Sequence, residues 1–189
     1  MIKLIVGLGN PGQQYEKTRH NAGFLFLDSL ASERYSAWSS KPEFQGVMST
    51  INIADEKILL LKPQSFMNRS GFSVGKVVRY YKLASDEILV VHDELDFKAG
   101  VVRLKKDGGH AGHNGLRDII SHLGAKDFYR LRLGIGRPNP GVVVADYVLS
   151  APANSEWQLL LSAISAGKSY IDRMVVGDMQ AVMNSLNMT

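Results

Sequence analysis

The stretch IKLIVGLGNPGQQYEKTRHNAG, residues 2–23, decides how the rest of the chain is interpreted. Its first part, Ile2–Val6, is short, mostly apolar and rich in β-branched residues, which is typical of a buried strand. A turn rich in glycine follows, and then a polar loop that ends at His20 and Asn21. Ligands bind at the carboxyl ends of strands in open α/β sheets, so this loop is a predicted site.

The turn spells Gly-x-Gly-x-x-Gly over residues 7–12, which raises a dinucleotide-binding alternative. That fingerprint needs a helix that opens at its third glycine and an acidic residue about 20 residues later, at the end of a second strand. Residues 13–19 have no apolar face, and Glu33 lies within a helical pattern. We therefore expect no nucleotide cofactor.

The composition narrows the class of protein. A chain of 189 residues fits one domain, 1–189, with a sizeable core. It contains no cysteine, which excludes disulfides, thiolate catalysis and cysteine-rich zinc sites. We find no signal-peptide pattern and no apolar stretch long enough to cross a bilayer, so we expect a cytoplasmic protein without a membrane partner.

The positive charge is concentrated in one segment. The formal net charge is +4, but residues 98–137 hold nine Lys or Arg and three Asp, a net +6 that leaves −2 for the remainder. A basic segment on a slightly acidic protein indicates a polyanionic partner. The alternative is a solvated charged face without a partner.

Apolar periodicity predicts the order of the elements. Strands are expected at 2–6, at 44–53 and 57–61 as a hairpin, and at 87–92, 101–105, 129–135 and 142–149. Helices are expected at 21–35 with Asn21 as N-cap, at 74–81, at 116–123, and as two segments of the tail 153–187 broken near Gly177; residues 36–43 are expected to form a loop. Strand–helix–strand order implies parallel pairs. The expected fold is a single α/β domain with a twisted, mixed, partly parallel sheet flanked by helices.

Polar side chains stand at four strand-to-loop junctions: Asn10 and His20, Asn68, Asp93, and Asn114. If the strands share a sheet, these side chains can converge, although each of them alone also fits a turn or a cap. His110 and His113 with Asp107 could hold a metal ion. We favour a solvent-facing or loop-stabilising role for these histidines and expect no metal.

Six motifs occur in order: VGLGNPG (6–12), TRHNAGF (18–24), KPQSFMNRSG (62–71), VHDELD (91–96), GGHAGHNGLRDI (108–119) and RLRLGIGRP (130–138). Together they resemble the bacterial peptidyl-tRNA hydrolase family over the chain up to about residue 150. The resemblance implies a monomeric enzyme without metal or cofactor. Such an enzyme cleaves the ester between a peptide and the 3′ end of tRNA and thereby recycles tRNA. The alternative is a non-catalytic RNA-binding factor on the same fold.

The resemblance also implies roles for individual residues. His20 would be the general base that activates water, because an imidazole titrates near neutral pH, and Asp93 would fix its tautomer. Asn10 would recognise the blocked amino end of the peptide. The remaining implied contacts are Asn68 and Asn114 with the peptide and the 3′-terminal nucleotide, Tyr15, Phe66 and Met67 with base or peptide, and Lys105 and Arg132 with the 5′ phosphate. Lys106 and Asp107 depart from the family's glycine-richer pattern.

Overall fold

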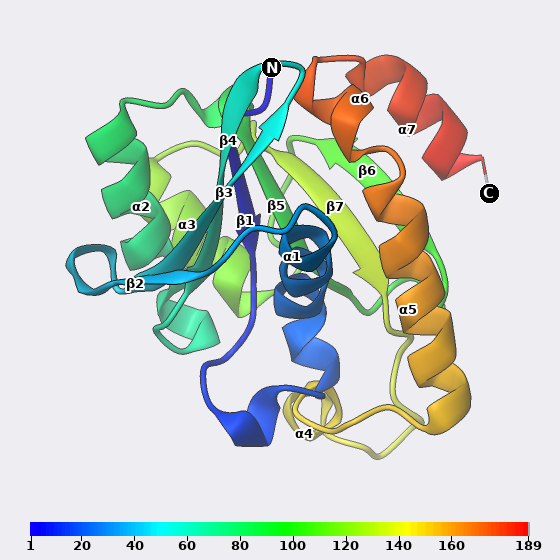
Figure 1. Ribbon diagram of the computed structural model, residues 1–189. Helices are drawn as coiled ribbons and strands as arrows, with labels where there is room; N and C mark the ends of the chain where they lie inside the picture. Colours follow the sequence, from blue (N-terminus) through cyan, green and yellow to red (C-terminus); the bar gives the residue numbers. More distant parts are fainter. Residues whose placement is uncertain (189) are drawn as a thin grey trace.

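Seven strands form one mixed sheet in the computed structural model, which describes residues 1–188; the order is β2-β3-β4-β1-β5-β7-β6 (Figure 1). The four central strands, β4 (Glu56–Pro63), β1 (Leu4–Gly7), β5 (Ile88–Glu94) and β7 (Tyr129–Gly134), are parallel to one another. The outer strands β2 (Ser39–Lys41), β3 (Gly46–Ile53) and β6 (Val102–Lys106) pair antiparallel. The predicted mixed, partly parallel sheet is confirmed.

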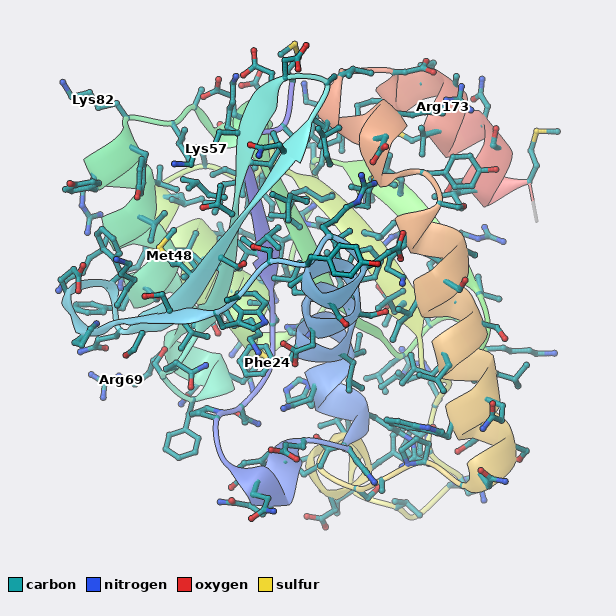
Figure 2. All side chains as sticks on the ribbon, viewed as in Figure 1. Phe24, Met48, Lys57, Arg69, Lys82 and Arg173 are labelled. Atoms are coloured by element: carbon teal, nitrogen blue, oxygen red, sulfur yellow. The ribbon has the colours of Figure 1, made fainter. Side chains whose placement is uncertain are left out.

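Helices cover both faces of the sheet, as Figure 1 shows. One face packs against α1 (Ala22–Glu33), α5 (Asn154–Lys168), α6 (Ile171–Val175) and α7 (Met179–Asn187). The other face packs against α2 (Ser70–Tyr81) and α3 (Asn114–Leu123). Figure 2 shows the side chains that fill both layers. Because both faces are covered, the central strands are apolar runs, and all four residues of β1 are buried.

Gly7 at the end of β1 and Gly23 in α1 allow the helix to pack closely against the sheet. A Cβ on Gly7 would lie 2.4 Å from the carbonyl oxygen of Gly23, and a Cβ on Gly23 would lie 2.3 Å from that of Val91. Helix α1 therefore rests directly on the backbone of β1 and β5. Gly12 precedes only the 3-10 turn η1 (Gln13–Tyr15), so no α-helix opens there. The loop consequently lacks the helix N-terminus that a dinucleotide site requires.

Three local predictions are wrong. Residues 36–43 contain the short edge strand β2 as well as loop. The run 142–149 is not a strand: it contains helix α4 (Val144–Val148) and contributes none of the seven strands of the sheet. Arg19 Nη1 donates to the carbonyl of Tyr147 in this helix and to that of Ser150 just beyond the run. The tail forms three helices, since the segment before the predicted break at Gly177 divides once more between α5 and α6.

We expect Gly23→Ala to lower the free energy of unfolding by about 3 kcal/mol, because its Cβ would collide with backbone atoms that cannot move independently. Gly75→Ala is the matched control, also a buried helical glycine. Its Cβ would meet the flexible end of Arg79 at 3.1 Å, so the change should stay within about 1 kcal/mol. Urea unfolding measures both variants, and equal effects would contradict this account of the contact between α1 and the sheet.

Candidate active site

Asp93 and His20 meet at the carboxyl end of β5. Asp93 is the penultimate residue of that strand, and His20 lies in the 3-10 turn η2 (Arg19–Asn21), directly before α1. The Nδ1 of His20 donates to Asp93 Oδ2 at 2.9 Å, and the two side chains are 12% and 2% exposed. Because Nδ1 carries the proton, Nε2 keeps a free lone pair and can accept a proton.

A second imidazole binds the other oxygen of the same carboxylate. The Nε2 of His113 donates to Asp93 Oδ1 at 2.8 Å, and its Nδ1 accepts from the backbone N–H of Leu116 at the start of α3. The expectation that His113 faces solvent or only stabilises its loop is therefore wrong. For His110 it is confirmed, since its Nδ1 accepts from the N–H of Gly112 within the loop. The spacing of His110 and His113 indicated a possible metal site, and it gave no indication of the bond from His113 to Asp93.

The two imidazoles decide the charge of Asp93. Burial alone would raise the pKa of this carboxyl, but His20 and His113 together hold the pKa well below its usual range. For His20, burial lowers the pKa, while the charge of Asp93 and its hydrogen bond raise it, and the net shift is upward from 6.5. Asp93 is therefore an anion, and it strengthens His20 as a base.

His92 is the fourth ionisable group at this position. Its ring packs edge-on against His113 at 4.9 Å, and its Nδ1 donates to the carbonyl oxygen of Asp93 at 2.7 Å. Its Nε2 is buried without a hydrogen-bond partner among residues 1–188. Burial is the main cause that lowers the pKa of His92 to about 3, so the imidazole is neutral at physiological pH.

Asn10 is held by two other loops. Its backbone N–H donates to Asn21 Oδ1 at 2.8 Å, and Asn21 Nδ2 donates back to the Asn10 carbonyl at 2.9 Å. Asn21 is therefore a clamp on the first loop, and its side chain does not cap α1 as predicted. Asn10 Oδ1 accepts from the N–H of Met67 at 2.7 Å. This bond orients the Asn10 amide, and no acceptor within residues 1–188 takes its Nδ2–H2 group.

The aromatic and amide candidates lie on the same two loops. Tyr15 and Phe66 meet edge-to-face with ring centroids 6.3 Å apart, and Phe66 is 56% exposed. Asn68 is exposed in the turn η4 (Met67–Arg69). Met67 differs from these three, since its side chain is 4% exposed and packs in the core beneath α3. It supports the loops through its backbone and its packing.

A cavity of about 440 Å³ lies beside the histidines. Its lining includes five predicted residues, His20, Asp93, Asn114, Lys105 and Arg132. Asn10 instead lines another hollow of about 380 Å³, and Tyr15, Phe66, Met67 and Asn68 line neither of the two. The structure thus gathers His20, Asp93 and the basic candidates around one space, and it does not bring Asn10 into that space.

The basic lining comes from neighbouring strands. In the register of β6 with β7, Lys105 is opposite Arg130 and Arg103 is opposite Arg132. Arg103 and Arg132 both stack on the ring of Phe97, at 5.0 and 4.7 Å from its centroid. None of the ion pairs among residues 1–188 involves these four cations. Glu94 and Asp96 act on Arg132 through their charge without pairing with it. A group of four cations free of ion pairs is typical of a binding surface for anions.

Sequence reasoning missed Arg19, which ties the wall of the cavity to the catalytic loop. Its guanidinium donates to Ser150 Oγ at 2.7 Å and to Glu156 Oε2 at 2.8 Å, and it stacks on Tyr147 at 4.0 Å. These contacts hold α4, whose Val144 and Val148 line the cavity. The only signal in the sequence was that Arg19 is a charged residue directly before His20. The partners of Arg19 lie more than a hundred residues away along the chain, so the sequence did not indicate them.

The same histidines and aspartate could hold a metal ion. Ligand atoms of His20, Asp93 and His113 lie within 4.8 Å of one another. A metal between them would replace both protons that the imidazoles now donate to Asp93.

The histidine–aspartate pair, placed at the carboxyl end of a parallel sheet beside a basic wall, has the arrangement that general-base hydrolysis of an anionic substrate uses. Comparisons with known proteins identify the family. A family model described as peptidyl-tRNA hydrolase matches residues 4–189. The chain therefore belongs to the peptidyl-tRNA hydrolase family, as the six motifs predicted.

Individual relatives agree over almost the full length. The peptidyl-tRNA hydrolase of Methylococcus capsulatus is 51% identical over 187 residues, which cover 99% of this chain and 100% of that one. The protein of the same name from Dichelobacter nodosus is also 51% identical, over 183 residues, 96% of this chain and 97% of that one. The crystal structure of peptidyl-tRNA hydrolase from Acinetobacter baumannii superposes with a TM-score of 0.95 at 45% identity, with 98% and 94% of the two chains covered.

His92 makes stability sensitive to acid. It binds a proton near pH 6.5 when unfolded but only near pH 3 when folded, so the unfolded state binds more protons in that interval. The free energy of unfolding therefore falls as the pH falls, by at most about 3 kcal/mol between pH 7 and pH 4 from this site. We expect His92→Gln to remove much of that loss, measured by urea unfolding at several pH values.

The control for this prediction is His122→Gln, which changes a histidine at the surface of α3. It should leave the pH dependence of stability close to that of the wild type. Parallel pH profiles for wild type and His92→Gln would show that His92 is not the buried group responsible.

Proposed function

We propose that the chain hydrolyses the ester between a peptide and the 3′ end of tRNA, with His20 as the general base. Family membership supports the reaction, and the 2.9 Å bond from His20 Nδ1 to Asp93 supports the base. Water gives its proton to His20 Nε2 and attacks the ester carbonyl. When the tetrahedral intermediate collapses, the bond to the 3′ oxygen breaks, the protonated His20 gives its proton to that oxygen, and tRNA leaves with a free 3′ hydroxyl while the peptide leaves with a free carboxyl end. No covalent enzyme intermediate forms.

Asp93 keeps His20 in the reactive tautomer and stabilises the imidazolium that forms when the proton arrives. Asp93 can stabilise an imidazolium because it is an anion. His113 helps to keep Asp93 ionised by donating to its second carboxylate oxygen. In the proposed mechanism each imidazole bonds Asp93 through an N–H group, and no step requires a metal ion.

The amide side chains supply neutral donors around the scissile ester. Asn10 suits recognition of the acylated amino end, because Met67 occupies its oxygen and leaves its Nδ2–H2 group free to donate. Asn68 and Asn114 would hold the peptide backbone and the 3′-terminal nucleotide. The half-buried Tyr15 and the exposed Phe66 form an aromatic pair that an unpaired base or a peptide side chain can stack on.

Lys105 and Arg132 would bind the 5′ phosphate of tRNA. Both line the cavity that contains His20, and neither has a carboxylate partner among the ion pairs of the described residues. We propose a cytoplasmic enzyme that acts as a monomer and recycles tRNA from aborted translation. Within residues 1–188, no helix is long and apolar enough to span a bilayer.

We expect His20→Ala to slow hydrolysis of N-acetylaminoacyl-tRNA by about 100-fold or more, because general-base catalysis typically contributes that much. Wild-type activity should survive a chelator and should fall as the pH drops through the raised pKa of His20, where the base becomes protonated. Release of the labelled acyl group from tRNA measures the rate.

Aminoacyl-tRNA with a free amine is the substrate control, and it should be spared. Tight tRNA binding without turnover by the wild type would instead favour the alternative, a non-catalytic RNA-binding factor. Loss of activity in chelator, restored by a divalent cation, would favour a metal at His20, Asp93 and His113.

We expect Lys105→Gln and Arg132→Gln to reduce discrimination in favour of substrates with a 5′ phosphate by about tenfold each, since a charge-assisted bond would be lost. The measurement compares kcat/KM on 5′-phosphorylated and 5′-dephosphorylated N-acetylaminoacyl-tRNA. The control is Lys57→Gln on β4, a lysine far from the cavity lining. If Lys105→Gln and Arg132→Gln kept the wild-type preference, the proposed binding of the 5′ phosphate by these two residues would be refuted.

A further inference from the structure

The parts of the site follow the order of the strands across the sheet. Lys105 and Arg132 lie on β6 and β7. Asp93 lies at the end of β5, and Asn10 follows β1, which is the next strand in the same direction. In the proposed function these positions take, in turn, the tRNA, the scissile ester and the first amide of the peptide. A longer peptide therefore extends toward the carboxyl end of β4, the strand beyond β1.

The Asn10 hollow, the space of about 380 Å³ that Asn10 lines, lies at that end of β4. Its lining includes Lys62 near the end of β4 and Gln64 directly after the strand. Leu25 of α1 and Trp157 of α5 are half-buried and supply apolar surface. A concave space with an apolar part and a few polar groups is typical of a ligand site.

Asn10 connects this hollow with the catalytic cavity. His20 lines the cavity of about 440 Å³, whereas Asn10 lines only the Asn10 hollow of the two. The bonds to Asn21 and Met67 hold Asn10 in place and leave its Nδ2–H2 group free to donate. A peptide whose ester lies beside His20 and whose first amide reaches Asn10 therefore has its next residues in the Asn10 hollow.

Strand spacing sets how many residues of a peptide reach this hollow. Neighbouring strands lie about 4.8 Å apart, so the two steps from β5 to β4 cover about 10 Å. An extended peptide advances about 3.3 Å per residue, and about three residues span that distance. The second to fourth residues, counted from the ester, therefore fall within the Asn10 hollow.

The charges in the lining of the Asn10 hollow balance. It contains two carboxylates, Glu16 and Asp28, and two ammonium groups, Lys17 and Lys62. Lys62 is paired with Asp28 at 2.5 Å. Glu16 and Lys17 are exposed, and neither takes part in an ion pair among residues 1–188. One free charge of each sign suits a ligand whose side chains vary in charge.

We propose that the Asn10 hollow binds the second to fourth residues of the peptide, counted from the ester, without preference for their charge. This assignment rests on the proposed function. Apolar side chains of the peptide contact Leu25 and Trp157, and charged ones pair with Glu16 or Lys17. The hollow thereby favours substrates with several peptide residues over those with a single acylated amino acid, whatever their sequence.

The first test is kcat/KM on tRNA that carries N-acetylated peptides of one to six residues. For the wild type we expect a rise of about tenfold up to the fourth residue and then a plateau, because apolar surface is buried at each added residue. Gln64→Trp places a ring in the hollow, so the rise should fall below about twofold while the one-residue substrate is cleaved as before. Gln180→Trp, at an exposed position on α7, is the matched control.

The second test uses charge. Substrates with Asp or Lys as the third residue from the ester should be cleaved equally by the wild type. Glu16→Lys should favour the Asp substrate by about threefold, since exposed ion pairs contribute modestly. The control is Asp86→Lys in the 3-10 turn η5 (Ser85–Glu87), an exposed position directly before β5 and thus at the opposite edge of the sheet. A flat length profile in the wild type, an unchanged rise in Gln64→Trp, or equal cleavage of both substrates by Glu16→Lys would overturn the site.

A binding measurement separates this proposal from the reaction itself. N-acetylated peptides with a free carboxyl end are titrated into the wild type and followed by NMR at the backbone amides of Gly12 and Gln64, which both line the hollow. We expect saturable shifts with a four-residue peptide and none with an N-acetylated amino acid. Such shifts without cleavage of any tRNA ester would support the peptide site and refute the reaction. Absence of the shifts would overturn the site even if every ester is cleaved.

Discussion

The charge of Asp93 is the constraint on which the rest of the site depends. A carboxylate that is 2% exposed stays ionised only if donors surround it, and two imidazoles donate to it, one to each oxygen. One imidazole precedes α1 and the other caps α3, so the carboxylate joins helices on the two faces of the sheet. The bond from His20 to Asp93 also fixes the tautomer of His20. One interaction therefore both stabilises the fold and orients the imidazole.

The approach of α1 to the sheet places His20 where it can reach Asp93. Gly7 and Gly23 allow backbone contact between α1 and the central strands, which any larger side chain would prevent. The turn η2 that carries His20 is thereby held against the end of β5. The pattern Gly-x-Gly-x-x-Gly, which elsewhere indicates a phosphate loop, here permits close packing of a helix and begins a loop that ends in His20.

The substrate side of the cavity follows from the antiparallel pairing of β6 with β7. Alternation along both strands turns Arg103, Lys105, Arg130 and Arg132 to one face, where no carboxylate pairs with them in the described residues. The opposite face of the same strands packs in the core through Leu104 and Leu131. The fold thus collects positive charge beside His20 and Asp93 by ordinary strand geometry, and an anion bound at this wall would relieve the electrostatic cost.

The sequence by itself determined six of the seven strands, the mixed sheet, and the gathering of His20, Asp93 and Asn114, because apolar runs and polar strand ends are local features. It also determined the family, through six ordered motifs. Only the tertiary structure decided that 142–149 contains a helix, where Arg19 from a distant loop donates to the carbonyl of Tyr147 and to that of Ser150 just beyond it. It also turned His113 toward Asp93 and Asn21 toward Asn10. The physical reason is that a hydrogen-bonding side chain takes whichever partner the fold brings within about 3 Å, and sequence spacing does not specify that partner.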